Sequence, residues 1–171
     1  GGKEVTPMAI RTVEDKNGNV ILTPELDIRK EQAAKKDKIQ IISPQTAFVM
    51  TKLLEQTVNG GGTLAGQKGR FEYKASNGRS YRMPAAGKTG TAEVVYYGPQ
   101  KEKYGTNTLN LVHVGYAPFE NPEVAYAVVI PWATTNFSNY TSYNNHIARE
   151  ILDVYFELKE KRASNGTLTS T

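Results

Sequence analysis

The chain has 171 residues, no cysteine and a net charge of +4, which suits one domain with a sizeable core and excludes disulfide frameworks and thiolate zinc sites. No apolar run reaches the length that spans a membrane. The densest basic run, at residues 29–38, is interrupted by acidic residues and lacks aromatics, which favours a solvated connector or short helix over a nucleic-acid site.

The first part of the chain predicts a hairpin and then a capped helix. Apolar and β-branched stretches at residues 9–13 and 19–22 flank Asn17-Gly18, a strong signal for a tight turn. After a polar stretch that runs to residue 38, Ser43 is placed to cap a helix with Pro44 at its first position. The residues of this helix that we expect in the core share one face, namely Ala47, Met50, Leu54 and Val58.

The middle of the chain predicts a second hairpin that leads into a strand. Aromatic residues alternate with charged ones at residues 70–74 and 79–83, and Asn77-Gly78 joins the two stretches. Residues 91–97 are rich in β-branched and aromatic side chains, which favours a strand. Residues 98–108 read as a polar loop.

The last part predicts an antiparallel pair of strands and a closing helix. The strands are expected at residues 109–116 and 124–130, around Asn121-Pro122. One apolar stripe marks the helix, made of Ile147, Ile151, Val154 and Leu158. The chain is therefore predicted to be α+β, with an antiparallel sheet packed against helices and a disordered polar tail at residues 162–171.

The stretch at residues 85–93, with the sequence Ala-Ala-Gly-Lys-Thr-Gly-Thr-Ala-Glu, carries the strongest chemical signal. Lys88 supplies a positive charge, and the hydroxyls of Thr89 and Thr91 can donate hydrogen bonds to an anion. The glycines allow a ligand to approach the backbone closely, because they have no Cβ. These residues together are suited to binding a carboxylate.

The same residues also match the end of a phosphate-binding Walker A loop, but two features disfavour that interpretation. The Walker motif needs a glycine five positions before Gly87, where this chain has Arg82. It also needs a helix after the loop, to hold the phosphates with its first N–H groups. Residues 91–97 favour a strand, so the carboxylate interpretation is preferred.

A Lys-Thr-Gly element occurs in penicillin-binding proteins and class A β-lactamases. The longer run at residues 87–93 resembles the transpeptidase domain of class B penicillin-binding proteins, most closely those of Gram-positive bacteria that act in cell elongation. Residues 41–47 and 60–63 resemble the segments before the motif in this family, and residues 114–118 and 121–125 resemble the strands after it.

The resemblance implies that residues 1–161 are the C-terminal part of a transpeptidase domain, in the fold shared by penicillin-binding proteins and serine β-lactamases. The implied function is a serine-type peptidoglycan D,D-transpeptidase, which cross-links stem peptides through an acyl-serine intermediate. The implied location is the extracellular face of the bacterial cell membrane, anchored by a transmembrane helix upstream of this chain.

The same resemblance implies the partners. These are the D-Ala-D-Ala stem peptide, β-lactam antibiotics, the upstream half of the same domain and the cell-wall elongation machinery, with its links to cell shape and antibiotic resistance. Nucleic acid, cofactors and metal ions are not expected. His113 and His146 lack partners at metal-ligand spacing and are predicted to be packing or surface residues.

Two motifs of the family are missing from these residues. The family uses a nucleophilic serine in a Ser-x-x-Lys motif and a Ser-x-Asn motif, both before the lysine motif. No serine here has a lysine three positions later, and Ser142-Tyr143-Asn144 comes after Lys88, where a polar loop ahead of a helix is favoured. We therefore expect the nucleophile upstream of this chain, and the chain alone to be inactive.

The resemblance assigns catalytic roles to Lys88 and Thr91, and substrate-binding roles to Thr89, Gly90 and Thr91. Lys88 would hydrogen-bond toward the serine of the missing Ser-x-Asn motif. The two threonine hydroxyls would bind the terminal carboxylate of the stem peptide, and the N–H of Thr91 would be one of two oxyanion donors. Gly90 would permit close approach of the acyl group.

Two alternatives within the fold remain open. One is a β-lactamase or D-Ala-D-Ala carboxypeptidase, which admits water to the acyl-enzyme. The other is a non-catalytic β-lactam sensor domain, in which acylation is a signal. The residues that separate these functions would lie upstream of this chain.

Overall fold

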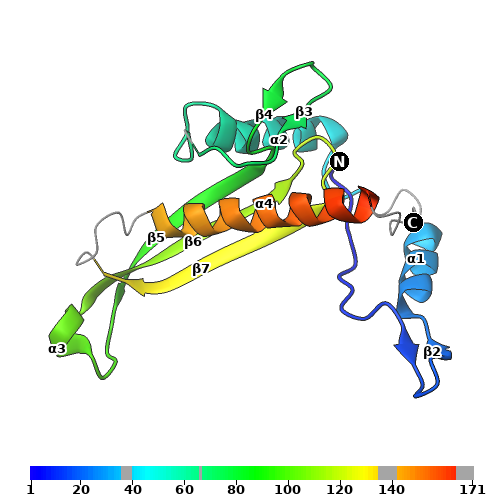
Figure 1. Cartoon of the computed structure of the whole chain (residues 1–171), viewed down its shortest axis with the longest axis horizontal. Coiled ribbons are helices and arrows are strands. Elements are labelled where there is room, and N and C mark those ends of the chain that lie inside the picture. Colours follow the sequence, from blue (N-terminus) through cyan, green and yellow to red (C-terminus); the bar gives the residue numbers. More distant parts are fainter. Residues whose placement is uncertain (36–39, 66, 135–141, 165–171) are drawn as a thin grey trace. The chain divides into compact units, whose positions relative to one another are not determined.

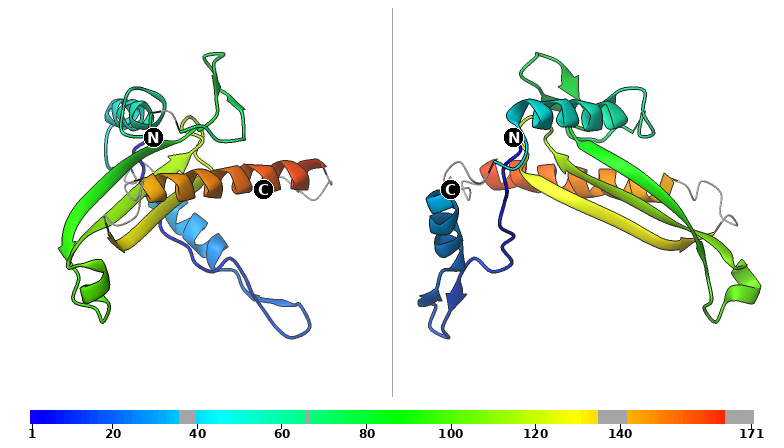
Figure 2. Two further views of the ribbon diagram at one scale, coloured as in Figure 1. Left: turned by 60° about the vertical axis from the view of Figure 1, so that its left-hand side comes forward. Right: turned by 180° about the vertical axis from the view of Figure 1, so that it is seen from behind.

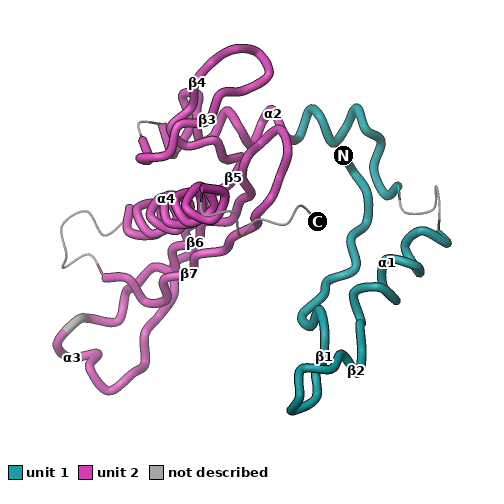
Figure 3. Tube along the Cα trace, turned by 45° about the vertical axis from the view of Figure 1, so that its right-hand side comes forward, with its two compact units in different colours: residues 1–50 teal, residues 51–171 magenta. Residues whose placement is uncertain are grey.

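The computed structural model describes residues 1–35, 40–65, 67–134 and 142–164 (Figure 1). Its contacts divide the chain into two units, Gly1–Met50 and Thr51–Thr171 (Figure 3). None of the helices in the described part of the chain is both long and apolar enough to cross a membrane.

The first unit contains the hairpin predicted around Asn17-Gly18. Strands β1 (Val13–Glu14) and β2 (Val20–Leu22) pair antiparallel, so the first strand is shorter than predicted. Asp15 closes the turn, because its Oδ1 accepts the N–H groups of Asn17 at 2.8 Å and Asn19 at 2.9 Å. Helix α1 (Pro24–Lys35) follows, in the region where a connector or short helix was predicted.

Helix α2 (Pro44–Asn59) begins in the first unit and ends in the second. The Ser43 Oγ accepts the N–H of Thr46 at 3.1 Å, which confirms the predicted cap.

The predicted buried face of α2 is only partly correct. Val58 is buried, and Ala47 and Leu54 are half-buried, but Met50 is 46% exposed. The placement of Met50 in the core was wrong, because apolar spacing identifies one face of a helix without showing how far along it the core extends. Here the buried apolar contacts lie at the end of α2, where Val58 joins a cluster with Leu64.

The main sheet of the second unit has three antiparallel strands in the order β5-β6-β7. They are β5 (Ala86–Val95), β6 (Asn107–Ala117) and β7 (Val124–Ala133). Each overlaps one of the strands predicted at residues 91–97, 109–116 and 124–130. The predicted antiparallel sheet is confirmed, and β5, which carries the lysine motif, lies at its edge.

Two shorter features flank this sheet in the sequence. Strands β3 (Tyr73–Lys74) and β4 (Ser80–Tyr81) form the predicted second hairpin. The region at residues 98–108 was predicted to be a loop, but it contains helix α3 (Lys101–Tyr104) and the start of β6. A single turn of polar residues carries no apolar periodicity, so this helix left no pattern to detect.

Helix α4 (Tyr143–Ser164) lies along one face of the sheet (Figures 1 and 2). Its buried residues are Asn144, Asn145, Ala148, Leu152, Asp153 and Phe156. The predicted stripe of Ile147, Ile151, Val154 and Leu158 was wrong as the packed face, because these side chains are 41–47% exposed.

Two of the polar residues in the buried stripe of α4 bond to backbone groups of distant segments. Asn144 Nδ2 donates to the carbonyl oxygen of Val112 at 2.9 Å, which joins the helix to β6. Asp153 Oδ1 accepts the backbone N–H groups of Arg70 at 2.7 Å and Phe71 at 3.1 Å. Since a buried polar group needs a partner, these bonds let asparagine and aspartate occupy core positions.

The ends of α4 also bear on two predictions. Tyr143 and Asn144 lie in the first turn of the helix, so only Ser142 of the Ser142-Tyr143-Asn144 triplet precedes it, and the predicted loop ahead of the helix was wrong for the other two residues. The helix continues to Ser164 and so includes the first three residues of the predicted tail. Residues 165–171 of that tail lie outside the described residues.

Candidate functional site

The lysine motif lies on the exposed half of edge strand β5. Lys88, Gly90 and Thr91 are exposed and Thr89 is half-buried, whereas Ala86 and Gly87 are buried. The strand therefore enters from the core and presents the four residues predicted to form the site at the border of the sheet.

The pairing register assigns these side chains to two faces. Thr89 lies opposite His113, and Thr91 lies opposite Leu111, so both threonines share the face that α4 covers. Lys88 lies opposite Val114, which is 45% exposed, on the other face. A ligand in contact with all three side chains must therefore lie along the edge of β5 itself.

Lys88 supplies a positive charge that has no carboxylate partner among the described residues. Its Nζ donates to the carbonyl oxygen of Thr89 at 2.8 Å. The ion pairs between described residues involve other lysines and arginines. The ammonium group can therefore attract an anion to this edge without first breaking an ion pair.

The hydroxyl of Thr89 has a partner, Thr63, that was not among the predicted site residues. The Oγ1 atoms of Thr89 and Thr63 are 3.1 Å apart, and either can be the donor. Thr63 follows the glycines at residues 60–62, in the segment whose resemblance was noted only as a family feature. The triple glycine marks the end of α2, where Cβ atoms at Gly60 and Gly62 would meet Gln56 and Thr57, but it did not predict the contact with β5.

Gly87, directly before Lys88, has no room for a side chain. A Cβ at this position would lie 2.9 Å from the carbonyl oxygen of Val114 and 3.1 Å from His113 Nε2. A Cβ at Gly115, on the neighbouring strand, would lie 2.6 Å from the Tyr126 hydroxyl. Because both positions are glycine, β5 and β6 can pair while the side chains of His113 and Tyr126 pack directly against them.

These two buried side chains contact each other beneath the strand. The Tyr126 hydroxyl lies 3.2 Å from His113 Nε2, and their rings meet edge to face. Burial lowers the pKa of His113 from 6.5 to about 4, and burial also raises the pKa of Tyr126 above its ordinary value. His113 is therefore neutral at physiological pH, as expected for a packing histidine.

A further hydrogen bond holds the residues that enter β5. Asn59, at the end of α2, donates from Nδ2 to the carbonyl oxygen of Ala85 at 3.2 Å. Ala85 is fully buried, so this bond satisfies a backbone acceptor that water cannot reach. The entry to the strand is thus fixed, while the motif itself remains accessible.

Several polar and aromatic residues outside the motif lie away from this edge or have packing contacts. Asn144 is buried and bonded to β6, and His146 is exposed on α4. Trp132 is 52% exposed at the end of β7, with its ring centroid 5.6 Å from that of Tyr96. None of these residues joins Lys88, Thr89 and Thr91 in the described structure.

Comparisons with known proteins agree with the resemblance carried by the motif. The family model described as the penicillin binding protein transpeptidase domain matches residues 1–153. Penicillin-binding protein 2A of Bacillus subtilis is 37% identical over 172 residues, which cover 98% of this chain and 21% of that protein. Penicillin-binding protein H of the same organism is 29% identical over 150 residues, which cover 86% of this chain and 20% of that protein.

A third relative, penicillin-binding protein 1A of Clostridium acetobutylicum, is 40% identical over 86 residues, which cover 50% of this chain and 8% of that protein. The chain therefore spans about a fifth of the length of the two Bacillus relatives. No solved structure matches it significantly.

Proposed function

We propose that this chain, which belongs to the family of penicillin-binding protein transpeptidase domains, forms the sheet side of a D-Ala-D-Ala transpeptidase active site. The observation that carries this proposal is the exposed Lys88, which lies on an edge strand without a carboxylate partner among the described residues. Two threonine hydroxyls stand beside it at the same edge.

Each motif residue has a distinct task in this proposal. Lys88 makes the edge electropositive and hydrogen-bonds toward a hydroxyl supplied by another part of the domain. The hydroxyls of Thr89 and Thr91 bind the terminal carboxylate of the stem peptide, or the carboxylate of a β-lactam that mimics it. The backbone N–H of Thr91 is one oxyanion donor, and loss of one such donor costs about 3–4 kcal/mol of transition-state stabilisation in comparable enzymes.

The nucleophilic serine comes from a part of the domain outside these 171 residues. Its hydroxyl oxygen attacks the carbonyl carbon of the penultimate D-alanine, the peptide bond breaks, and the terminal D-alanine leaves with the proton on its amine. An amine of a second stem peptide then attacks the acyl-serine, which forms the cross-link and returns the proton to the serine. Without this serine nucleophile, the present chain alone is inactive.

The proposal extends to the biological setting. The protein is a class B enzyme of cell elongation, and an upstream helix anchors it to the extracellular face of the cell membrane. Peptidoglycan stem peptides and β-lactams are its ligands, and the elongation machinery is its partner. The net charge of +4 is compatible with an acidic polymer as substrate.

The test is the intact mass of the protein after exposure to a reactive penicillin. The full-length protein should gain one penicilloyl group on a serine outside residues 1–171, and the chain alone should gain none. Lys88→Ala should slow the acylation by about 100-fold or more, the lower end of the range for one electrostatic contact in an active site.

Lys74→Ala is the matched control, since Lys74 is an exposed lysine on β3 that lies outside the motif. It should leave the acylation rate unchanged. A penicilloyl group on the chain alone would show that these residues carry their own nucleophile. An unchanged rate for Lys88→Ala would remove Lys88 from the site.

A further inference from the structure

A polar groove lies beside the residues that lead into β5. Its volume is about 610 Å³, within the range of about 300–1,000 Å³ that is typical of small-ligand sites. The end of α2, the loop after it and strand β4 form its walls. Two buried apolar side chains, Val58 and Met83, contribute to its lining.

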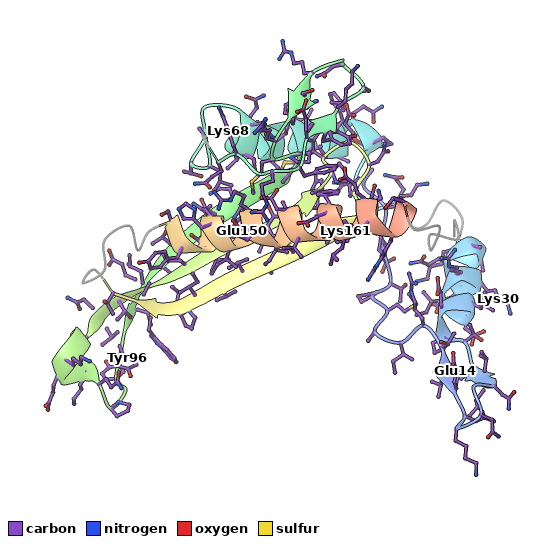
Figure 4. The ribbon with its side chains drawn as sticks, in the orientation of Figure 1. Glu14, Lys30, Lys68, Tyr96, Glu150 and Lys161 are labelled. Atoms are coloured by element: carbon purple, nitrogen blue, oxygen red, sulfur yellow. The ribbon has the colours of Figure 1, made fainter. Side chains whose placement is uncertain are left out.

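The groove is positively charged. Lys68 and Arg82 line it, and none of its lining residues is acidic. A backbone hydrogen bond from the Gly69 N–H to the Arg82 carbonyl oxygen, 2.8 Å long, brings the two basic segments together. Both side chains are exposed, and neither forms an ion pair with another residue in the described part of the chain (Figure 4 labels Lys68).

The remaining lining residues suit a peptide. Asn59, Gln67 and Ser80 bring amide and hydroxyl groups to the walls, and these can pair with peptide N–H and C=O groups. The apolar lining can contact the methyl and methylene groups of side chains. A free inorganic anion would contact only the two basic side chains, Lys68 and Arg82. A peptide with carboxylates would contact the basic, the polar and the apolar lining residues together.

We propose that this groove is a subsite for an extended peptide that carries carboxylates, separate from the edge occupied by Lys88. It rests on the proposed function only in that the peptide belongs to the same polymer that the active site processes. Asn59 lines the groove and also holds the carbonyl of Ala85, the residue before β5. A peptide bound here would therefore lie on the approach to the motif strand, where Lys68 and Arg82 pair with its carboxylates.

The test measures binding of a fluorescein-labelled peptide of alternating glutamate and alanine to the full-length protein by fluorescence anisotropy. A second peptide, with glutamine in place of glutamate, is the ligand control. The glutamate peptide should bind more tightly, and Lys68→Gln with Arg82→Gln should weaken its binding roughly tenfold, since each exposed charge contact contributes a factor of a few. Lys74→Gln with Arg79→Gln removes the same charge from positions of the β3–β4 hairpin that do not line the groove, and should leave the affinity unchanged.

Three results would overturn the subsite. One is equal weakening by both pairs of substitutions, which would indicate a response to net charge alone. Another is loss of peptide binding once penicillin has acylated the protein, which would place the peptide at Lys88. Competition by inorganic phosphate as strong as that by the glutamate peptide would also contradict it, because the peptide-binding walls would then contribute nothing.

The failure of the proposed function has a different signature. A protein that never reacts with penicillin, but binds the glutamate peptide through Lys68 and Arg82, would keep the groove and lose the transpeptidase assignment. A protein that is acylated normally, but binds the peptide equally well after both basic residues are replaced, would keep the transpeptidase assignment and lose the groove.

Discussion

Mild acid should lower the free energy of unfolding of this protein, because His113 is buried. Replacement of His113 by glutamine should remove the contribution of this residue to the loss. The His113 side chain is completely buried against the Tyr126 hydroxyl, and burial lowers its pKa from 6.5 to about 4. In the unfolded chain the imidazole has its ordinary pKa. Between these two values the unfolded state binds more protons than the folded state, so the free energy of unfolding falls as the pH falls.

The magnitude follows from the two pKa values. The stabilisation is almost fully present at pH 7, about 2 kcal/mol of it is lost by pH 5, and about 3 kcal/mol is lost by pH 4. Carboxylates whose pKa is lowered by hydrogen bonds, such as Glu120 and Glu150, also lose stabilisation in acid. The glutamine variant keeps those carboxylates, so the difference between the two proteins isolates the histidine.

The assay is urea unfolding of the full-length protein and of His113→Gln at pH 7, 6 and 5, followed by far-ultraviolet circular dichroism. The stability advantage of the natural protein over the variant should shrink by about 2 kcal/mol between pH 7 and pH 5. His146→Gln, which replaces an exposed histidine on α4, should follow the natural protein at every pH. Parallel pH dependences for the natural protein and His113→Gln would refute a neutral buried histidine.

Three further tests of the packing use thermal and urea unfolding of the full-length protein, two of them with a control substitution. Gly87→Ala should cost about 1–3 kcal/mol, because its Cβ would lie 2.9 Å from a backbone oxygen, whereas Gly90→Ala, with its nearest contact at 3.8 Å, should stay within about 0.5 kcal/mol. Equal costs would contradict the described pairing of β5 and β6. Leu152→Ala should cost about 2–5 kcal/mol and Ile151→Ala much less, since only Leu152 is buried; the reverse order would mean that α4 packs on its other face. Asp153→Ala should cost about 1–3 kcal/mol, because two backbone N–H groups lose their acceptor, and a neutral result would show that water replaces it.

Local signals in the sequence predicted most elements of the fold. Asn17-Gly18 and Asn77-Gly78 marked both hairpins, and Ser43 marked the start of α2, because turns and caps depend on residues that are adjacent in the chain. The position of β5 at the edge of the sheet has no local signal of this kind, since strand order depends on contacts between distant segments.

The face of α4 that packs on the sheet could not be read from its pattern. Two stripes run side by side along this helix, and the more apolar one, with Ile147 and Ile151, is exposed. The buried one contains Asn144 and Asp153, which look like surface residues until their partners on β6 and in the loop before β3 are known. Side-chain bonds to distant backbone groups therefore decided the orientation.

The candidate site was predictable in composition and less so in geometry. The motif identified Lys88, Thr89 and Thr91, but strand alternation places the lysine and the threonines on opposite faces of the sheet. The contribution of Thr63 depends on a loop that closes onto β5, and the groove lined by Lys68 and Arg82 depends on three separate segments. Neither arrangement has a signature in a linear sequence.

The division of β5 into a buried beginning and an exposed remainder has a consequence for how such a strand can evolve. Changes before Lys88 must satisfy the packing of Gly87 and Gly115 over the histidine and tyrosine, so that segment is constrained by folding. From Gly90 to Glu93 every residue is exposed, so replacements there have little cost to stability. Sequence changes can therefore accumulate in this half of the strand while the other half preserves the fold.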